Sequence, residues 1–572
     1  MGDRGVKILL IQPPVRDFYQ TSIRTQPIGL AYLAASLKNR GHEVEILDCQ
    51  TETKKSIPIP AELSYLKDFY PFNDRSPFKL YSGYYHFGMD WADIRKRVGN
   101  SKADVFGISS SFTPYHGEAL EIAQIIKEWD RRKIVVMGGA HVSCDPEGVL
   151  QSPSVDYVVL GEGEVRFPLL LEQIGKGKAK NNERIDGIGY RKVGTTRNRD
   201  GEIRINPLQS FIQDLDSLPQ PARELLDLDR YRLRKKRSTM IITSRGCPHG
   251  CAYCSGHLVM GTSFRTRTPE AILEEMMECQ EQYGIESFDI EDDNFTFDQK
   301  RAKQLMNLII EAFGEGKIEL SAMNGISFAS LDGELLQLMK KAGFRAINLS
   351  YVSTDPSTKE RMGRPKTTTE FDKILEEAEE VGLHVIAYAI LGMPGQSIGE
   401  MVNTLIYLMG KKVLIGPSIY YPTPGTPLFE RCNREGILPS RSVQWRSSAF
   451  PIETKEFNRI DLLTLFRLAR VINFIKGKMD GKELEEGMTW RELYQVLQEK
   501  VKVETEDKVE DKVKEMTWRD LLLIIFEGKS FFNLRKESGG KILVEKKGSS
   551  KKVLDCFFER AWQSPILKSH IE

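Results

Sequence analysis

Short apolar runs alternate with amphipathic helical patterns along two long stretches of the chain. In the first stretch the helical patterns cover residues 28–37 and 118–127, and the expected strands are 6–11, 44–47, 104–109, 134–137 and 157–160. Strands that are apolar along their whole length and alternate with helices are typical of a parallel sheet with both faces covered. We therefore predict a doubly wound α/β domain over residues 1–164, with an irregular insertion at 52–95.

The second stretch repeats the alternation from residue 239 to about residue 426. The expected strands are 240–243, 287–290, 319–322, 346–349, 385–388 and 417–420. Six βα units in this length are too few for a full eight-fold barrel, which needs about 250 residues. The pattern therefore predicts a partial (β/α)6 barrel over residues 238–430.

Two further regions complete the predicted organisation. Residues 165–237 are more polar, with a possible hairpin from 188–191 and 202–205, and are expected to form a connecting subdomain. Residues 431–572 have mostly helical patterns and are expected to form a helical C-terminal region. Met-Thr-Trp-Arg occurs at 488–491 and again at 516–519, which we interpret as a duplicated helix start with Thr as the N-cap.

Composition excludes several classes of protein. The formal net charge is +1 in 572 residues, so no basic surface favours nucleic acid as a partner. No apolar run approaches the roughly 18 residues of a membrane span, and residues 1–12 do not resemble a signal peptide. Eight cysteines are too few for a disulfide scaffold, and the expected location is the cytoplasm.

Three of the eight cysteines, Cys247, Cys251 and Cys254, lie within eight residues. Soft thiolates at this spacing select zinc or an iron–sulfur cluster. Zinc would need a fourth ligand, for which His249 and His257 are candidates. Structural zinc sites usually show paired two-residue spacings, and no second pair follows here. The spacing therefore favours a [4Fe–4S] cluster with one iron open to a substrate, in the loop after the first barrel strand.

The motif Cys247-x3-Cys251-x2-Cys254, with Tyr253 before the last cysteine and Thr-Ser-Arg-Gly at 243–246, resembles the signature of the radical S-adenosylmethionine (SAM) superfamily. The domain order resembles the branch with an N-terminal cobalamin (B12)-binding domain, which includes the class B radical SAM methyltransferases. The resemblance implies a Rossmann/flavodoxin-like cobalamin-binding-type domain and then a radical SAM barrel. It also implies that the three cysteines hold a [4Fe–4S] cluster. SAM would chelate the fourth iron and yield a 5′-deoxyadenosyl radical on reductive cleavage.

The resemblance also implies contacts to SAM at the carboxyl ends of the barrel strands. Polar groups after the second strand could equally form an ordinary turn, and Val352 stands where many relatives have a glutamate before the serine. The residues assigned to SAM on this basis are Tyr253, Asp292, Asp293, Asn324, Ser353, Gly392 and Pro394. The resemblance assigns no further catalytic residue.

Strand ends of the first domain resemble the turns that surround cobalamin in this branch. The residues assigned are Ser110, Ser111, Thr113, Gly138, Gly139, Gly161, Glu162 and Gly163. Residues 12–16 read Gln-Pro-Pro-Val-Arg where many cobalamin domains carry a cobalt-ligating histidine, so the cofactor is expected base-off without a histidine ligand. His116 and His141 are expected to be satisfied structural histidines. The alternative is a doubly wound domain that has lost its cofactor.

Together these features predict an enzyme in which the radical abstracts hydrogen from a carbon, followed by methyl transfer from methylcobalamin. Oxidative cyclisation or rearrangement without methyl transfer remains an alternative. A non-catalytic corrinoid-binding protein and a zinc-bound nucleic-acid module are alternatives of other classes. The expected partners are a small-molecule, lipid or peptide substrate and a reducing electron donor such as a flavodoxin or ferredoxin.

Overall fold

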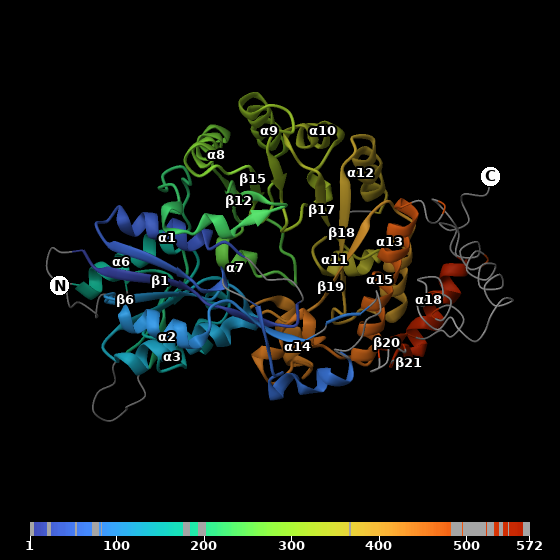
Figure 1. Cartoon of the computed structure of the whole chain (residues 1–572), viewed down its shortest axis with the longest axis horizontal. Coiled ribbons are helices and arrows are strands. Elements are labelled where there is room, and N and C mark those ends of the chain that lie inside the picture. Colours follow the sequence, from blue (N-terminus) through green and yellow to red (C-terminus); the bar gives the residue numbers. More distant parts are fainter. Residues whose placement is uncertain are drawn as a thin grey trace.

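The computed structural model shows two α/β domains followed by a C-terminal region (Figure 1). The residues that it describes are 5–19, 25–51, 54–70, 79–81, 83–175, 184–192, 202–364, 368–481, 485, 495, 522, 525, 531–536, 542–546 and 548–563. No helix among these residues is long and apolar enough to cross a membrane.

The first domain is built on a seven-stranded sheet with the order β10-β9-β8-β7-β6-β1-β3. Its strands are β1 (Lys7–Gln12), β3 (Glu43–Asp48), β6 (Val105–Ser109), β7 (Ile134–Gly138), β8 (Tyr157–Val159), β9 (Ile188–Arg191) and β10 (Ile203–Ile205). The five strands from β3 to β8 pair in parallel. This confirms the doubly wound sheet, in which β6 is the middle one of the five parallel strands.

Helices cover both faces of this sheet, because the strands carry apolar side chains on both faces. Ile8 and Leu10 pack with α1 (Ile28–Lys38) and α6 (Gly163–Gly175). Leu9 and Ile11 pack with α2 (Trp91–Asn100) and α3 (His116–Trp129). Figure 1 shows the two helix pairs on opposite sides of the sheet.

Two parts of the first half differ from the prediction. The expected hairpin forms as β9 and β10, but β9 pairs antiparallel with β8 and extends the first sheet, so this part of 165–237 does not form a separate subdomain. The insertion is more regular than expected. It contributes β4 (Lys54–Ile57) and β5 (Tyr84–Phe87), which form a small sheet with β2 (Val15–Asp17).

The second domain is an open barrel of six parallel strands, as predicted. These are β12 (Lys236–Ile241), β15 (Ser287–Ile290), β16 (Glu319–Ser321), β17 (Ala346–Val352), β18 (His384–Leu391) and β19 (Leu414–Ile419). Parallel bridges from Leu320 to Phe344 and from Ile326 to Leu349 link the two three-strand halves.

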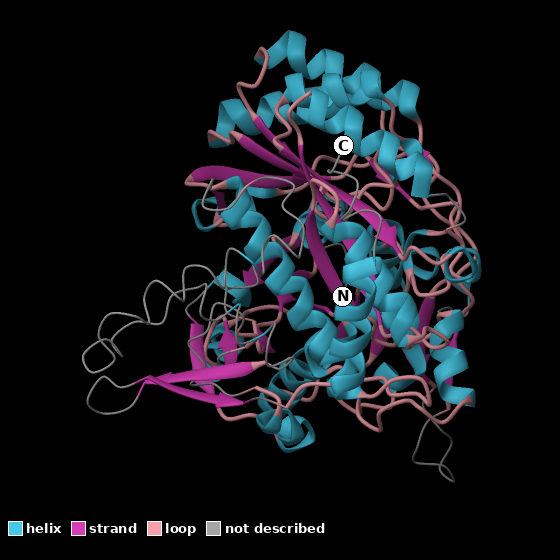
Figure 2. Ribbon diagram, turned by 90° about the vertical axis from the view of Figure 1, so that its right-hand side faces the viewer, coloured by secondary structure: helices cyan, strands magenta, loops and turns pink. Residues whose placement is uncertain are grey.

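Helices cover the outside of the barrel strands (Figure 2). They are α8 (Pro269–Tyr283), α9 (Gln299–Phe313), α10 (Gly333–Ala342), α11 (Pro356–Arg361), α12 (Thr368–Glu380) and α13 (Ile398–Met409). Thr268 caps α8 at its start, and Gly284 ends it in the left-handed conformation.

The C-terminal region contains α14 (Pro427–Arg434), α15 (Arg459–Asp480) and α18 (Lys551–Gln563). It also contains an antiparallel hairpin, β20 (Phe532–Lys536) with β21 (Ile542–Lys546), which the helical prediction missed. Ile542-Leu543-Val544 is rich in β-branched and apolar residues, which favour strands. The repeated Met-Thr-Trp-Arg segments lie outside the described residues.

Candidate active site

The three cysteines lie on a loop at the carboxyl end of the first barrel strand. The short strands β13 (Ser244–Arg245) and β14 (Arg265–Thr266) pair antiparallel and close this loop. Gly246 starts the loop with φ of +84°, and a Cβ there would lie 2.3 Å from the carbonyl oxygen of Ser263. Only glycine fits this position. We call residues 246–264 the cysteine loop.

Side chains from distant segments contact the thiols. Arg364 Nε donates to Cys251 Sγ at 3.1 Å. Asn294 Nδ2 lies 3.9 Å from Cys247 Sγ as a donor. Burial raises the pKa of the Cys247 thiol, and the guanidinium of Arg364 acts in the opposite direction. The loop therefore presents its thiols beside a fixed cation, which favours the thiolate form that a metal centre needs.

The residues present fit a bound cluster with a polar ligand. Asn294 is 3% exposed, and its Oδ1 has no hydrogen-bond partner in the described part of the chain. A buried acceptor without a donor costs free energy, so a group that donates at this point would satisfy it. The amino group of SAM is such a donor. Within the described ranges, no three His, Cys, Asp or Glu side chains converge as a site for a single metal ion.

The two aspartates that follow β15 have different surroundings. Asp292 is buried and accepts hydrogen bonds from Thr243 N at 2.7 Å and from Ser244 Oγ at 2.6 Å. Its oxygens therefore brace the strand before the cysteine loop. Asp293 accepts from Gly246 N at 3.2 Å and faces the loop itself. Of the two, only Asp293 bonds the backbone of the cysteine loop.

Asn324 lies beside a pair of acidic side chains on β15 and just after it. Its Nδ2 donates to Glu291 Oε2 at 2.6 Å, and Ser321 Oγ donates to Asp289 Oδ1 at 2.7 Å. Asp289 and Glu291 are hydrogen-bonded to each other. Burial, followed by the charge of Asp289, raises the pKa of Glu291 to about 7. The two carboxyl groups therefore share a proton near neutral pH.

Ser353 forms a hydrogen bond with a carboxylate on a helix. Ser353 is fully buried, and its Oγ donates to Glu400 Oε1, on α13, at 2.9 Å. Val352 precedes it with φ of +71°, at an irregularity in the pairing of β17 with β18. A β-branched residue in this conformation is strained, and such strain gathers at functional sites. Glu400 Oε1 also accepts a hydrogen bond from Gln396 Nε2 at 3.1 Å, so this carboxylate ties Ser353 to the start of α13.

The turn after β18, which holds Gly392 and Pro394, is contacted by neighbouring helices. A Cβ on Gly392 would lie 2.8 Å from Leu462 on α15, so this glycine allows close packing of that helix. Arg431 Nη1 donates to the carbonyl oxygen of Pro394 at 3.1 Å. Tyr253, in the cysteine loop, hydrogen-bonds Arg364. The structure brings Tyr253 to the cysteines and gives Gly392 a packing role.

The first domain has a hollow at the carboxyl ends of β1 and β6. It is lined by Gln12, Pro13, Pro14, Val15, Thr25, Gln50, Ser109, Ser110, Ser111, Phe112 and Tyr115. Gln50 is 9% exposed, and its Oε1 has no partner among the described residues. Ligands of doubly wound sheets bind at the carboxyl ends of the strands. A polar cofactor such as a corrinoid could donate a hydrogen bond to this unpaired acceptor.

Two histidines pack beneath this edge. Ser110 Oγ lies 3.1 Å from His116 Nδ1, and Thr113 Oγ1 lies 3.1 Å from His141 Nδ1. The imidazole ring centroids are 4.2 Å apart. Burial lowers the pKa of His116 to about 3, with a contribution from His141, and lowers that of His141 to about 4. Both are neutral, partnered histidines, as predicted.

The glycine turns assigned to cobalamin are also shaped by close contacts. Gly139 has φ of +109°, and a Cβ there would lie 2.8 Å from the carbonyl oxygen of Ser110. Gly138 ends β7, and Ser111 Oγ lies 3.0 Å from Ser109 Oγ. Gly139 leads into α4 (Ala140–Cys144), which with α5 (Pro146–Leu150) precedes β8. The turn therefore lies directly beside the Ser110 backbone.

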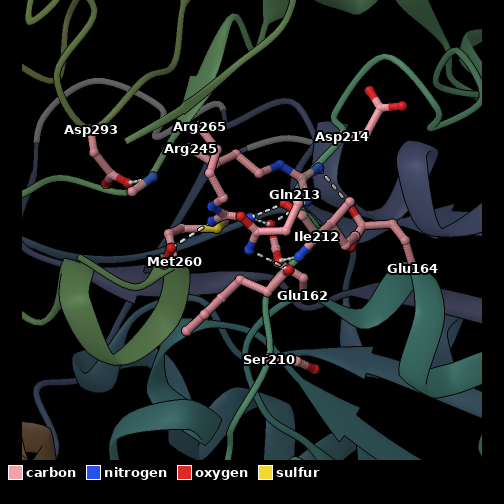
Figure 3. A network of polar contacts seen from close by, with 12 residues as sticks. Glu162, Glu164, Ser210, Ile212, Gln213, Asp214, Arg245, Met260, Arg265 and Asp293 are labelled. Atoms are coloured by element: carbon pink, nitrogen blue, oxygen red, sulfur yellow. Dashed lines mark hydrogen bonds and ion pairs between the residues drawn. The ribbon is translucent and has the colours of Figure 1, made fainter. Parts of the chain in front are cut away.

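The surroundings of Glu162 do not fit its assignment as a cobalamin contact (Figure 3). Its side chain is fully buried, and Oε1 lies 2.7 Å from Arg265 Nη1 and 3.1 Å from Arg245 Nη1. Oε2 accepts from Ile212 N at 2.7 Å. Gly161 N donates to Ser143 Oγ, and Gly163 begins α6. Both carboxylate oxygens of Glu162 are therefore occupied by protein groups.

The two candidate sites meet at the domain boundary. Helix α4 follows the Gly138-Gly139 turn of the first domain, and α7 (Gly256–Met260) follows Cys254 in the barrel. These two helices pack against each other. Cys144, at the end of α4, hydrogen-bonds Ser255. The edge of the first-domain sheet that holds the Gly138-Gly139 turn is therefore directly connected to the cysteine loop of the barrel.

Sequence reasoning did not assign four of the residues that complete these sites. Asn294 stands next to Asp293 but was not singled out, and Gln50 had no motif around it. Arg364 follows its partner Cys251 by 113 positions in the chain. Glu400 follows its partner Ser353 by 47 positions. No local pattern indicates such contacts.

Comparison with known proteins agrees with this architecture. The model of the radical SAM superfamily matches residues 241–408, and the model of the B12 binding domain matches residues 83–171. The uncharacterized methyltransferase PH0819 of Pyrococcus horikoshii is 27% identical over 84% of this chain and 95% of that protein. Cytidylyl-2-hydroxyethylphosphonate methyltransferase of Streptomyces wedmorensis is 27% identical over 77% of this chain and 84% of that protein.

A solved structure shares the fold. The radical S-adenosylmethionine methyltransferase TsrM from Kitasatospora setae, with cobalamin and a [4Fe–4S] cluster bound, aligns with a TM-score of 0.57 and 20% identity. The alignment covers 75% of this chain and 78% of TsrM.

Proposed function

Because this chain belongs to the radical SAM superfamily, in the branch that carries a B12-binding domain, we propose that it is a cobalamin-dependent radical SAM methyltransferase acting on a carbon atom. Two relatives that carry the name methyltransferase support this proposal, and each aligns over most of its own length and most of this chain. Methyl transfer is favoured over cyclisation for this reason.

The observation that carries the proposal is the packing of α4 on α7. It joins the edge of the first domain that holds the Gly138-Gly139 turn to the loop that holds Cys247, Cys251 and Cys254. A carbon radical made at one cofactor must meet a methyl group carried by the other, so the two sites have to share one reaction space. The carboxyl ends of the strands in the two domains lie next to each other through α4 and α7, which supports such a shared space.

When bound, the cluster and SAM supply a 5′-deoxyadenosyl radical, and the corrinoid carries the methyl group. The protein's own groups bind and orient these cofactors. The three cysteines would hold three irons, and Asn294 Oδ1 and Asp293 would accept hydrogen bonds from the SAM amino group. Gln50 and Ser111 line a small hollow at the sheet edge that would face the corrinoid.

Finer features of the proposal follow from the first domain. The cobalamin is base-off without a histidine ligand, because residues 12–16 lack a histidine and Nδ1 of His116 and of His141 bonds Ser110 and Thr113, respectively. A flavodoxin or ferredoxin would deliver the electron, in the reducing cytoplasm that an open cluster requires.

Apolar side chains at strand ends suggest the class of substrate. Phe112 follows β6, Phe297 follows β15 and Met323 follows β16, and these side chains are 46%, 42% and 56% exposed. Phe112 lines the hollow of the first domain, and the ring centroid of Phe297 lies 6.0 Å from that of His249 in the cysteine loop. We propose a small-molecule substrate with an apolar face.

The test is an anaerobic reconstitution with iron, sulfide and hydroxocobalamin, followed by SAM with a deuterated methyl group and a chemical reductant. We expect retained corrinoid, a [4Fe–4S] EPR signal, formation of 5′-deoxyadenosine and the deuterated methyl group on the corrinoid. The Cys251→Ala variant should lose the cluster signal and 5′-deoxyadenosine but retain corrinoid, whereas Cys556→Ala should behave as wild type.

The other outcomes select the alternatives. A cluster and 5′-deoxyadenosine without retained corrinoid would exclude methyl transfer and favour cyclisation or rearrangement. Corrinoid without 5′-deoxyadenosine would identify a non-catalytic corrinoid-binding protein.

A further inference from the structure

Two arginines stand opposite each other at the base of the cysteine loop. Arg245 on β13 pairs directly with Arg265 on β14 in the antiparallel ribbon that closes the loop. Both side chains are 4% exposed. Like charges at directly opposed positions of a ribbon repel each other, and burial strengthens the repulsion. The ribbon therefore needs an anion between its two guanidinium groups.

That anion comes from the first domain. Glu162 Oε1 lies between Arg245 Nη1 and Arg265 Nη1, and Figure 3 shows both arginines reaching down to it. Glu164 adds a second carboxylate, with Oε1 2.6 Å from Arg245 Nη2. Two arginines and two glutamates form a buried group with no net charge. Removal of Glu162 would leave one positive charge uncompensated at the base of the loop.

Further contacts hold the same arginines to neighbouring segments. The Arg245 guanidinium lies 5.5 Å from the ring centroid of Tyr32 on α1. Arg265 Nη1 and Nη2 donate to the carbonyl oxygens of Ile212 and Met260, each at 2.6 Å. Met260 ends α7, within the cysteine loop. The network therefore ties the turn after β8, through Arg265, to the helix that follows Cys254.

We propose that Glu162 is a positioning residue, whose carboxylate neutralises the paired arginines and holds the cysteine loop in a set place against the first domain. The proposal replaces the assignment of Glu162 as a cobalamin contact. It accounts for a fully buried glutamate at the carboxyl end of β8 that faces the barrel. For its consequence in catalysis, it rests on the proposed two-cofactor function.

The first test needs no cofactor. Amide hydrogen exchange is measured on the full chain for wild type, Glu162→Gln, Glu162→Asp and Glu172→Gln. Glu172 lies on α6, the helix that begins directly after Glu162, and makes an exposed ion pair with Arg40 at 2.8 Å, which makes it the matched control. We expect exchange in residues 244–266 to rise at least tenfold in Glu162→Gln, with β6 and β7 unchanged. Glu162→Asp keeps the charge and should recover much of the protection.

Each outcome decides the proposal. Wild-type exchange in residues 244–266 of Glu162→Gln would overturn it. If that variant loses protection throughout the chain, Glu164→Gln is read instead, because it removes only one of the two carboxylates on Arg245. In Glu164→Gln, an increase of at least threefold in the exchange of residues 244–266 supports the proposal, and unchanged exchange there overturns it.

A second measurement separates positioning from general stability. In the reconstituted and reduced chain, magnetic broadening of the cobalt EPR signal by the cluster reports the separation of the two centres. We expect Glu162→Gln to retain both cofactors and to show altered broadening, and Glu172→Gln to match wild type. If wild type itself retains no corrinoid, the proposed function fails, while the exchange experiment still decides the role of Glu162.

Discussion

Arg364 Nε lies 3.1 Å from Cys251 Sγ, although 113 positions separate the two residues in the chain. The contact is possible because Gly363 packs against the cysteine loop, where a Cβ would lie 3.0 Å from the carbonyl oxygen of Gly250. A permanent positive charge therefore stands beside the thiols.

This charge predicts an effect on cluster reduction. A nearby cation stabilises the reduced, more negative form of a cluster, so Arg364→Gln should lower its reduction potential by several tens of millivolts. Arg361→Gln, an exposed arginine on α11, is the control and should leave the potential unchanged. The measurement is a redox titration followed by EPR. An equal potential in wild type and Arg364→Gln would contradict the prediction.

Asp292 predicts a loss of stability. Its carboxylate accepts hydrogen bonds from Thr243 N and Ser244 Oγ in a fully buried position. Asp292→Ala leaves these donors unpaired and should lower the free energy of unfolding by about 2–3 kcal/mol. Asp292→Asn keeps an acceptor for the Thr243 amide and should cost about 1 kcal/mol. Thermal unfolding of the two variants checks the order, and equal losses would show that the hydrogen bonds are not the cause.

Glu291 predicts a pH dependence of stability. Burial and the charge of Asp289 raise the pKa of Glu291 from 4.5 to about 7. Between these values the folded carboxyl keeps a proton that the unfolded chain releases, so stability falls as pH rises from 4.5 to 7. Glu291→Gln removes this loss. It should therefore exceed wild type by about 2 kcal/mol at pH 8 and by less than about 1 kcal/mol at pH 5.

Thermal unfolding of the chain without cofactors at the two pH values provides the test for Glu291. A difference between Glu291→Gln and wild type that does not change with pH would refute the shared proton.

The histidine pair predicts the opposite trend in acid. Burial lowers the pKa of His116 to about 3 and that of His141 to about 4, both from 6.5. The unfolded chain therefore binds more protons below pH 6.5, and stability is lost as pH falls from 6.5 towards 4. Each histidine should cost about 2 kcal/mol at pH 5. His116→Gln should remove about half of the loss between pH 7 and pH 5, and parallel unfolding curves for the two proteins would count against it.

Much of the fold was predictable because its signals are local. The apolar run at 385–388 lies within β18, and the run at 240–243 overlaps the last two residues of β12. The hairpin β20–β21 was missed because alternating short runs in a Lys- and Glu-rich tail carry a weak signal. The pairing of β9 with β8 depends on which sheet edge is free, and no single segment encodes that.

The candidate site divides along the same line. The spacing of Cys247, Cys251 and Cys254 by itself indicates a thiolate centre, since residues this close in sequence must share one loop. The same sequence cannot distinguish a glutamate that contacts a ligand from one that is buried between two arginines. Glu162 was assigned to cobalamin because it lies at a strand end, and its surroundings assign it to Arg245 and Arg265 instead.

The sequence alone determined the alternation of strands and helices, the order of the two domains and the cysteine loop, because each rests on residues that are neighbours in the chain. Tertiary structure decided the partners of Glu162, Arg364 and Ser353. A charged or polar side chain acts according to what faces it, and here the facing groups come from other elements through the docking of two domains and the register of the barrel strands.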